Sequence, residues 1–141
     1  MTILYAESSA VLSWLLGEPH QQDIVAELSK ADEVVTSTIT AIECGRALLR
    51  ARVEGRLKPT DEMAALRLLD DAVERWTVLG LSDEVDHRAR QEFPNEPLRT
   101  LDALHLATAS VFAEALGDIR MLSLDERVRT NARSLGMAIA P

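Results

Sequence analysis

The sequence predicts an α/β fold, a single three-layer domain over residues 1–141 in which helices flank a mostly parallel central sheet. Short apolar runs alternate with helical segments along the chain, a pattern typical of a parallel sheet covered on both faces. A length of 141 residues suits one domain, and the 47% of hydrophobic residues can bury its core. No repeat, low-complexity segment or obvious linker divides the chain.

The first 55 residues predict two strands and three helices, in the order strand 2–6, helices 8–16 and 20–31, strand 33–37 and helix 36–55. Both strands are short runs, TILYA and EVVTS. Ser37 or Thr38 can cap the start of the last of these helices, and Gly55 can end it.

The rest of the chain predicts four helices and three strands, in the order helix 59–76, strand 76–81, helices 83–93 and 100–116, strand 118–124, helix 125–136 and strand 137–140. Pro59 and Thr60 open the first of these helices, in which apolar residues recur at spacings of three and four. Two prolines, Pro94 and Pro97, mark a loop before an almost wholly apolar helix that begins near Thr100.

The composition limits the possible partners and the location. Fifteen basic and 23 acidic residues give a net charge of −8, which disfavours nucleic acid because phosphate contacts supply most of that affinity. Thirteen of the basic residues are Arg, however, which can grip phosphate with two hydrogen bonds, and two bound divalent cations would change −8 to −4. Cys44 is the only cysteine and no apolar run is long enough to span a membrane, so we expect a cytoplasmic protein.

Four acidic residues differ from the rest because each lies in an apolar run or just past a predicted strand: Glu7, Glu43, Asp102 and Asp125. Since the carboxyl ends of parallel strands form one edge, we expect these side chains to converge there. Carboxylates that close cannot all stay ionised without a cation, and oxygen ligands without a His/Cys cluster favour Mg²⁺ or Mn²⁺. Such ions suit hydrolysis at phosphorus by an activated water.

Each acid also has a purely structural explanation. Glu7 can favour the N-terminus of the next helix through the helix dipole, and Asp125 can cap its own helix. Neither role excludes a metal. The alternatives for the other two acids are contacts within their helices: Glu43 with Arg46 or Arg50, and Asp102 with Arg99 or His105.

Four segments of the chain, YAESSAVL, TITAIECGRAL, LDALHLATA and LSLDERVRTNARSLGM, resemble PIN-domain ribonucleases, and most closely the VapC-type toxins of bacterial type II toxin–antitoxin modules. The match covers essentially the whole chain, and DALHLATA is its most specific part. The resemblance implies a PIN-like fold and a metal-dependent endoribonuclease. It also implies that the acids hold Mg²⁺ or Mn²⁺ and serve catalysis: Glu7, Glu43, Asp102 and Asp125.

Other residues are candidates for supporting roles. The resemblance implies that Ser9 and Ser123 help to position metal or phosphate. His105 shares a helix face with Asp102 and can either orient that carboxylate or serve as a buried structural histidine. Arg46 and Arg50 can contact RNA or a protein partner, although exposed helical arginines usually do neither.

The resemblance further implies an RNA substrate, a homodimer and a cognate antitoxin whose peptide lies across the acidic cleft. The short apolar runs predict no membrane association. The family usually has Asp where this chain has Glu7, whose side chain is longer by about 1.5 Å. That difference and the negative net charge favour an alternative function, a catalytically weak or inactive PIN module that binds RNA or a protein without cleavage. A small-phosphoester enzyme is disfavoured because the chain has no glycine-rich phosphate loop.

Overall fold

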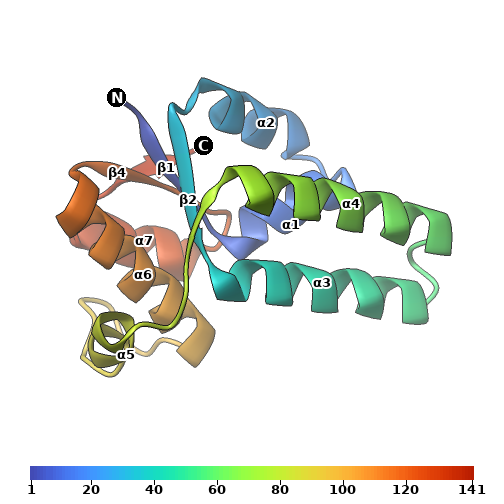
Figure 1. The fold of residues 1–141 in the computed structure, drawn as a ribbon. Coiled ribbons are helices and arrows are strands. Elements are labelled where there is room, and N and C mark those ends of the chain that lie inside the picture. Colours follow the sequence, from blue (N-terminus) through green and yellow to red (C-terminus); the bar gives the residue numbers. More distant parts are fainter.

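The computed structural model describes residues 1–141 and places one five-stranded sheet between two layers of helices (Figure 1). All strands are parallel and lie in the order β3-β2-β1-β4-β5, with β1 at the centre. The strands are β1 (Ile3–Ala6), β2 (Glu33–Ser37), β3 (Thr77–Leu79), β4 (Ile119–Leu122) and β5 (Ala138–Ala140). The predicted α/β fold with a parallel central sheet is therefore confirmed.

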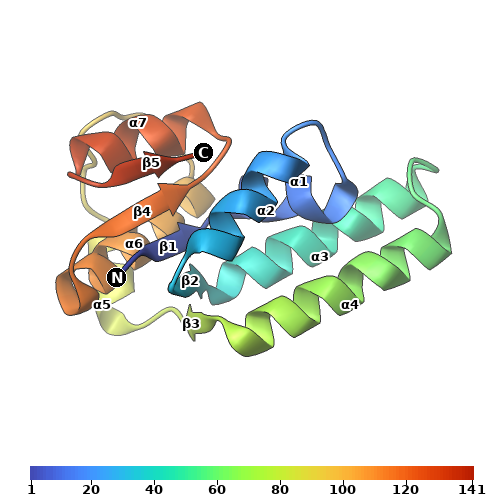
Figure 2. The ribbon, with the colours of Figure 1, turned by 90° about the horizontal axis from the view of Figure 1, so that it is seen from above.

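Seven helices connect and cover the strands: α1 (Ser8–Leu16), α2 (Gln21–Lys30), α3 (Thr38–Val53), α4 (Pro59–Arg75), α5 (Asp83–Ala89), α6 (Thr100–Leu116) and α7 (Glu126–Ser134). Figure 2 shows α1 to α4 gathered on one side of the sheet and α6 and α7 on the other. None of the helices combines the length and apolar character that crossing a membrane requires.

The alternation of side chains along β1 explains the two layers. Ile3 and Tyr5 point to one face and join the buried cluster under α5, α6 and α7, together with Leu106 and Val128. Leu4 and Ala6 point to the other face, toward the helices from α1 to α4. Because both faces of the strand are covered, all four of its residues are buried, as expected for a central parallel strand.

Several predicted elements were too long. The strand predicted at 76–81 forms only over Thr77–Leu79, at one edge of the sheet. The strand predicted at 118–124 ends at Leu122, because the N–H of Leu124 donates to Ser9 Oγ, 2.9 Å away, and does not join a strand. The helix predicted at 83–93 ends at Ala89, and the N–H of Phe93 donates to the Glu96 carboxylate at 2.9 Å. The errors at the ends of β4 and α5 lie where a side chain accepts a backbone N–H.

The helix caps place the candidate residues at the carboxyl edge of the sheet. Glu7 follows β1 and caps α1, Ser37 ends β2 and caps α3, and Asp125 follows β4 and caps α7. Ser37 is one of the two predicted caps, and Gly55, with a φ of 77°, lies just past the end of α3 as predicted. The helices α1, α3 and α7 therefore all begin at the same edge of the sheet.

Candidate active site

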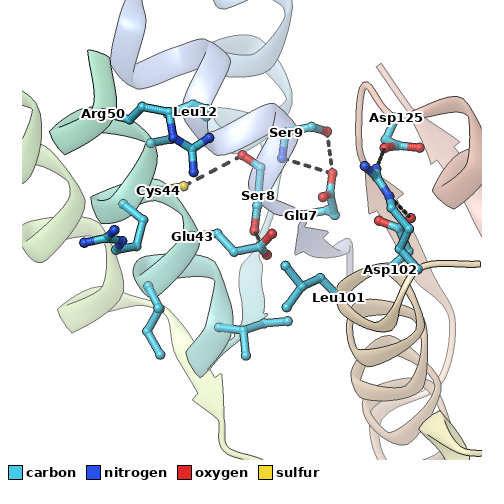
Figure 3. A pocket seen from close by; sticks show the side chains of 15 residues that line it. Glu7, Ser8, Ser9, Leu12, Glu43, Cys44, Arg50, Leu101, Asp102 and Asp125 are labelled. Atoms are coloured by element: carbon cyan, nitrogen blue, oxygen red, sulfur yellow. Dashed lines mark hydrogen bonds and ion pairs between the residues drawn. The ribbon is translucent and has the colours of Figure 1, made fainter. Parts of the chain in front are cut away.

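A cleft of about 530 Å³ opens at the carboxyl edge of the sheet, and all four of the predicted acids line it (Figure 3). They come from four separate segments: the β1–α1 junction, α3, α6 and the start of α7. The predicted convergence of these side chains is therefore observed. The rest of the wall is mixed, with apolar Leu12, Ile42 and Leu101 beside three arginines, Arg46, Arg50 and Arg99.

Glu7 lies at the centre of the cleft and is almost wholly buried, with 4% of its surface exposed. Its Oε2 atom accepts from the N–H of Ser9 at 3.1 Å, from the Ser9 hydroxyl and from Ser123 Oγ at 2.8 Å. Burial raises the pKa of Glu7 above its ordinary value of 4.5, although His105, Ser9 and Ser123 act in the opposite direction. Its other oxygen, Oε1, lies 4.0 Å from His105 Nε2.

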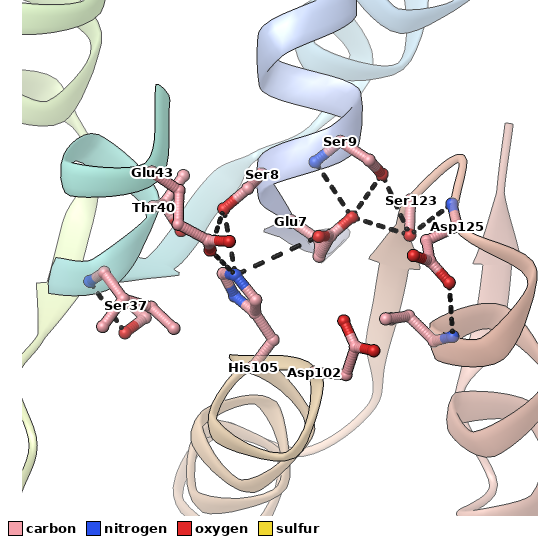
Figure 4. A network of polar contacts seen from close by, with 12 residues as sticks. Glu7, Ser8, Ser9, Ser37, Thr40, Glu43, Asp102, His105, Ser123 and Asp125 are labelled. Carbon is pink, nitrogen blue, oxygen red and sulfur yellow. Dashed lines mark hydrogen bonds and ion pairs between the residues drawn. The ribbon is translucent and has the colours of Figure 1, made fainter. Parts of the chain in front are cut away.

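Ser9 and Ser123 were predicted to support the site, and both contact Glu7. Each hydroxyl also receives a backbone N–H, Ser9 from Leu124 at 2.9 Å and Ser123 from Asp125 at 3.1 Å. The two serines thereby join the starts of α1 and α7 around a single carboxylate oxygen (Figure 4).

Glu43 is held by a buried polar network that the sequence did not predict. Its Oε1 atom lies 2.6 Å from His105 Nε2 and accepts from Ser8 Oγ at 2.7 Å. On the far side of the ring, His105 Nδ1 lies 2.8 Å from the Tyr5 hydroxyl, which is fully buried. An ionised carboxylate can only accept, so the tautomer of His105 with its proton on Nε2 satisfies the contact with Glu43.

This network affects the charge of Glu43. Partial burial raises its pKa, but the hydrogen bonds from His105 and Ser8 and the nearby charges outweigh that effect, so the pKa is lowered from 4.5. Burial and the charge of Glu7 raise the pKa of Tyr5 well above 10, so its phenol stays neutral. Glu43 is therefore a fixed carboxylate that remains ionised at neutral pH.

Asp102 and Asp125 share a single arginine. Arg99 Nε lies 3.3 Å from Asp102 Oδ2, and Arg99 Nη2 lies 3.5 Å from Asp125 Oδ2. Asp102 is only 5% exposed, and a buried carboxylate is costly without a partner. The ion pair with Arg99 supplies that partner in the first turn of an otherwise apolar helix. Asp125 Oδ1 accepts from the N–H groups of Arg127 at 2.9 Å and Val128 at 3.3 Å, which is the predicted cap.

Several sequence expectations are corrected by these contacts. Glu43 contacts neither Arg46 nor Arg50, because its carboxylate turns toward α6 and His105. His105 is buried as one alternative predicted, but it orients Glu43 and does not donate to Asp102. The sequence also did not predict the contacts of Tyr5 and Ser8 with His105, of Ser8 with Glu43 and of Arg99 with Asp125.

The donor set suits a hard divalent cation. Four carboxylates line the cleft, and Glu7 Oε1 accepts no hydrogen bond that would occupy it. Cys44 also lines the cleft, but burial raises the pKa of its thiol to about 12, so it is not a thiolate. As the side chains stand, no three of the acidic, histidine and cysteine groups are close enough to hold a metal ion. The guanidinium of Arg99 contacts Asp102 and Asp125, and His105 contacts Glu43. Carboxylates are the ligand type that a hard divalent cation prefers.

The sequence pattern that defines the PIN domain matches residues 4–134. The chain belongs to the PIN domain family. Among PIN relatives, ribonuclease VapC46 from Mycobacterium tuberculosis (strain H37Rv) is 34% identical over 139 residues, which is 99% of this chain and 97% of the relative. Ribonuclease VapC35 of the same strain is 29% identical over 140 residues, 97% of this chain and 95% of the relative.

Solved structures share the PIN fold. The VapC20 toxin of Mycobacterium tuberculosis superimposes with a TM-score of 0.65 at 15% identity, covering 98% of this chain and 99% of the other. FitAcB from Neisseria gonorrhoeae gives a TM-score of 0.71 at 16% identity, covering 98% and 96%. The resemblance and the fold predicted from the sequence are therefore confirmed.

Proposed function

We propose that this PIN-domain chain is a Mg²⁺- or Mn²⁺-dependent endoribonuclease and the toxin of a toxin–antitoxin pair. One observation carries the proposal: Glu7, Glu43, Asp102 and Asp125, from four segments of the chain, line a single cleft. The relatives that match over nearly the full length are named ribonucleases, which supports RNA as the substrate.

The four carboxylates would hold the cation, which when bound lowers the pKa of water and stabilises charge on the phosphate. Glu7 and Asp102 supply buried negative charge at the cleft floor, where water screens it least. Glu43 supplies an ionised oxygen whose direction is set by His105 and Ser8. An activated water needs no covalent enzyme intermediate. The Ser8 hydroxyl lies 2.9 Å from His105 Nε2, but it is buried and donates its proton to Glu43.

Two exposed arginines of α3 are suited to the RNA backbone. Arg46 and Arg50 line the same cleft as the acids, one helical turn apart. Neither forms an ion pair with an acidic side chain, so both guanidinium groups are available for phosphate. With only 4% aromatic residues, base stacking contributes little, and shape and backbone contacts would govern the choice of RNA.

The same proposal includes a cognate antitoxin, a homodimer and a cytoplasmic location. Two solved structures with the same fold are a toxin–antitoxin complex from Klebsiella pneumoniae and VapBC2 from Rickettsia felis bound to a promoter DNA fragment. These complexes support a protein partner for the present chain as well. The exposed Ile42 and Leu101 at the cleft mouth would offer such a partner apolar surface beside the arginines.

The test compares cleavage of a structured RNA by the wild type and by Asp102→Asn, with Mn²⁺ or with EDTA. We expect cleavage by the wild type with Mn²⁺ only, and a loss of at least about 100-fold in the variant. Asp86→Asn is the matched control, because Asp86 is an exposed acid on α5 that pairs with Arg90 at 3.0 Å. RNA binding that chelation does not affect, with no cleavage, would instead identify a non-catalytic PIN module.

A further inference from the structure

Arg99 occupies an unusual position among the basic residues of this chain. It immediately precedes α6, and its side chain is 67% exposed, yet its guanidinium lies within 3.5 Å of two acids of the cleft. The other two arginines of the cleft, Arg46 and Arg50, form no ion pair. Arg99 is therefore the only arginine that bridges the proposed metal ligands.

The guanidinium occupies the oxygens that a cation would use. Arg99 donates to the Oδ2 atoms of Asp102 and Asp125, and Asp125 Oδ1 is already committed to capping α7. The guanidinium of an arginine stays protonated in proteins, so Arg99 is always a cation. A divalent cation at these carboxylates and Arg99 in its present place would repel each other.

The surroundings of Arg99 leave it room to move. A second hollow of about 220 Å³ lies next to the cleft and is lined by Arg99, Thr100, Leu101, Glu43 and Asp102. The side chain is long and mostly exposed, so leaving the aspartates requires no change in the packed core. After leaving them it would still lie at the mouth of the same cleft, where the phosphate of a bound RNA must enter.

We infer that Arg99 is a catalytic residue with two successive partners: it pairs with Asp102 and Asp125 in the metal-free chain, and it binds the scissile phosphate once a cation has replaced it there. This inference rests on the proposed function. A guanidinium can donate two parallel hydrogen bonds to a phosphate, as it does to a carboxylate. Its positive charge would stabilise the negative charge that develops during cleavage.

The inference predicts opposite effects of one substitution on two measurements. In Arg99→Ala, Mn²⁺ binding measured calorimetrically without RNA should tighten by about two- to five-fold, because a competing exposed ion pair is gone. Cleavage of a structured RNA at saturating Mn²⁺ should fall by about 100-fold, because a donor to the phosphate is gone. Arg99→Lys keeps the charge but not the paired donors, so its cleavage should lie between those of the wild type and Arg99→Ala.

Arg90→Ala is the matched control, since Arg90 forms a comparable exposed ion pair on α5, outside the cleft, and both measurements should match the wild type. Weaker Mn²⁺ binding in Arg99→Ala would mean that Arg99 only supports the aspartates, and unchanged cleavage would mean that it does not touch the phosphate. Either result overturns the inference. Failure of the proposed function is distinguishable, because the wild type itself would then neither bind Mn²⁺ in the cleft nor cleave RNA.

Discussion

His105 Nε2 and Glu43 Oε1 lie 2.6 Å apart, although 62 positions separate the two residues in the chain. The same helix, α6, carries Asp102 and His105 three positions apart. One helix therefore supplies one acid of the cleft directly and fixes a second acid through hydrogen bonding. The Tyr5 hydroxyl holds the opposite side of the ring, so the direction of Glu43 depends on a contact with β1 as well.

Replacing His105 with alanine should weaken metal binding, although His105 is not itself one of the proposed metal ligands. Without the ring, Glu43 loses its donor and the buried Tyr5 hydroxyl loses a partner, at a cost of about 2–4 kcal/mol in unfolding free energy. We expect Mn²⁺ affinity to fall by about 10- to 100-fold, as for other residues that orient metal ligands.

Calorimetric titration with Mn²⁺ checks this prediction, with His105→Gln as the conservative variant. A glutamine can still donate from its amide nitrogen, so His105→Gln should recover part of the affinity. If His105→Ala were folded and bound Mn²⁺ like the wild type, the histidine would have no part in orienting Glu43.

Asp125 has two roles that different substitutions should separate. As the cap of α7, its Oδ1 accepts two backbone N–H groups, a function that asparagine can also perform. Asp125→Ala should therefore lower the unfolding free energy by about 1 kcal/mol, whereas Asp125→Asn should change it by only a few tenths.

Both substitutions remove the negative charge, so both should lose metal-dependent cleavage. Urea unfolding in EDTA and RNA cleavage with Mn²⁺ measure the two roles independently. Full activity in Asp125→Asn would show that Asp125 serves the helix and not the metal.

The buried carboxylate of Glu7 should make stability depend on pH. Because its pKa is raised in the folded chain, the folded state binds more protons than the unfolded state at pH values just above 4.5. The wild type should thus lose stability as the pH rises from 4.5 through the raised pKa, while Glu7→Gln, which has no carboxyl to ionise, should not.

Thermal unfolding in EDTA measures this difference. At pH 7 to 8 we expect Glu7→Gln to melt a few degrees above the wild type, since 1 kcal/mol shifts the melting temperature of such a chain by roughly 3–5 °C. The gap should narrow as the pH falls through and below 4.5, where Glu7 becomes protonated in the unfolded state as well. A difference in melting temperature that did not change with pH would exclude the ionisation of Glu7 as its cause.

Metal binding should stabilise the folded state, because a cation offsets the repulsion among the four acids. A ligand at 100 times its dissociation constant stabilises the folded state by about 2.7 kcal/mol. Mn²⁺ should therefore raise the melting temperature of the wild type, and the increase should be larger at pH 7 than at pH 4.5, where protons compete for Glu7. The increase should disappear in Asp102→Asn, and an equal increase in that variant would locate the metal elsewhere.

Local patterns in the sequence predicted the order of the helices and strands, and they singled out the four acids that line the cleft. Both inferences use only residue type and the residues nearby in the chain. The cap at Ser37, the end at Gly55 and the span Thr100–Leu116 follow from residue type and apolar spacing. Asp102 was recognisable because a carboxylate in an apolar helix needs a partner, and Arg99 three positions earlier was one of the two partners predicted.

The contacts that hold the cleft together were not predictable in the same way. Tyr5 and Ser8 meet His105 across 100 and 97 positions, which depends on how α1 and α6 pack on the sheet. Nothing near Ser8 distinguishes it from Ser9, yet Ser8 donates to Glu43 and Ser9 to Glu7. The direction in which Glu43 turns is likewise decided by α6 and not by the arginines of its own helix.

The most direct measurement is an anomalous-difference map from a crystal of the wild type soaked in Mn²⁺. The account predicts a manganese peak in the cleft contacting Glu7 and Asp102, with the Arg99 side chain withdrawn from Asp102 and Asp125. A cleft without manganese, in which Arg99 still bridges the two aspartates at high Mn²⁺ concentration, would contradict it.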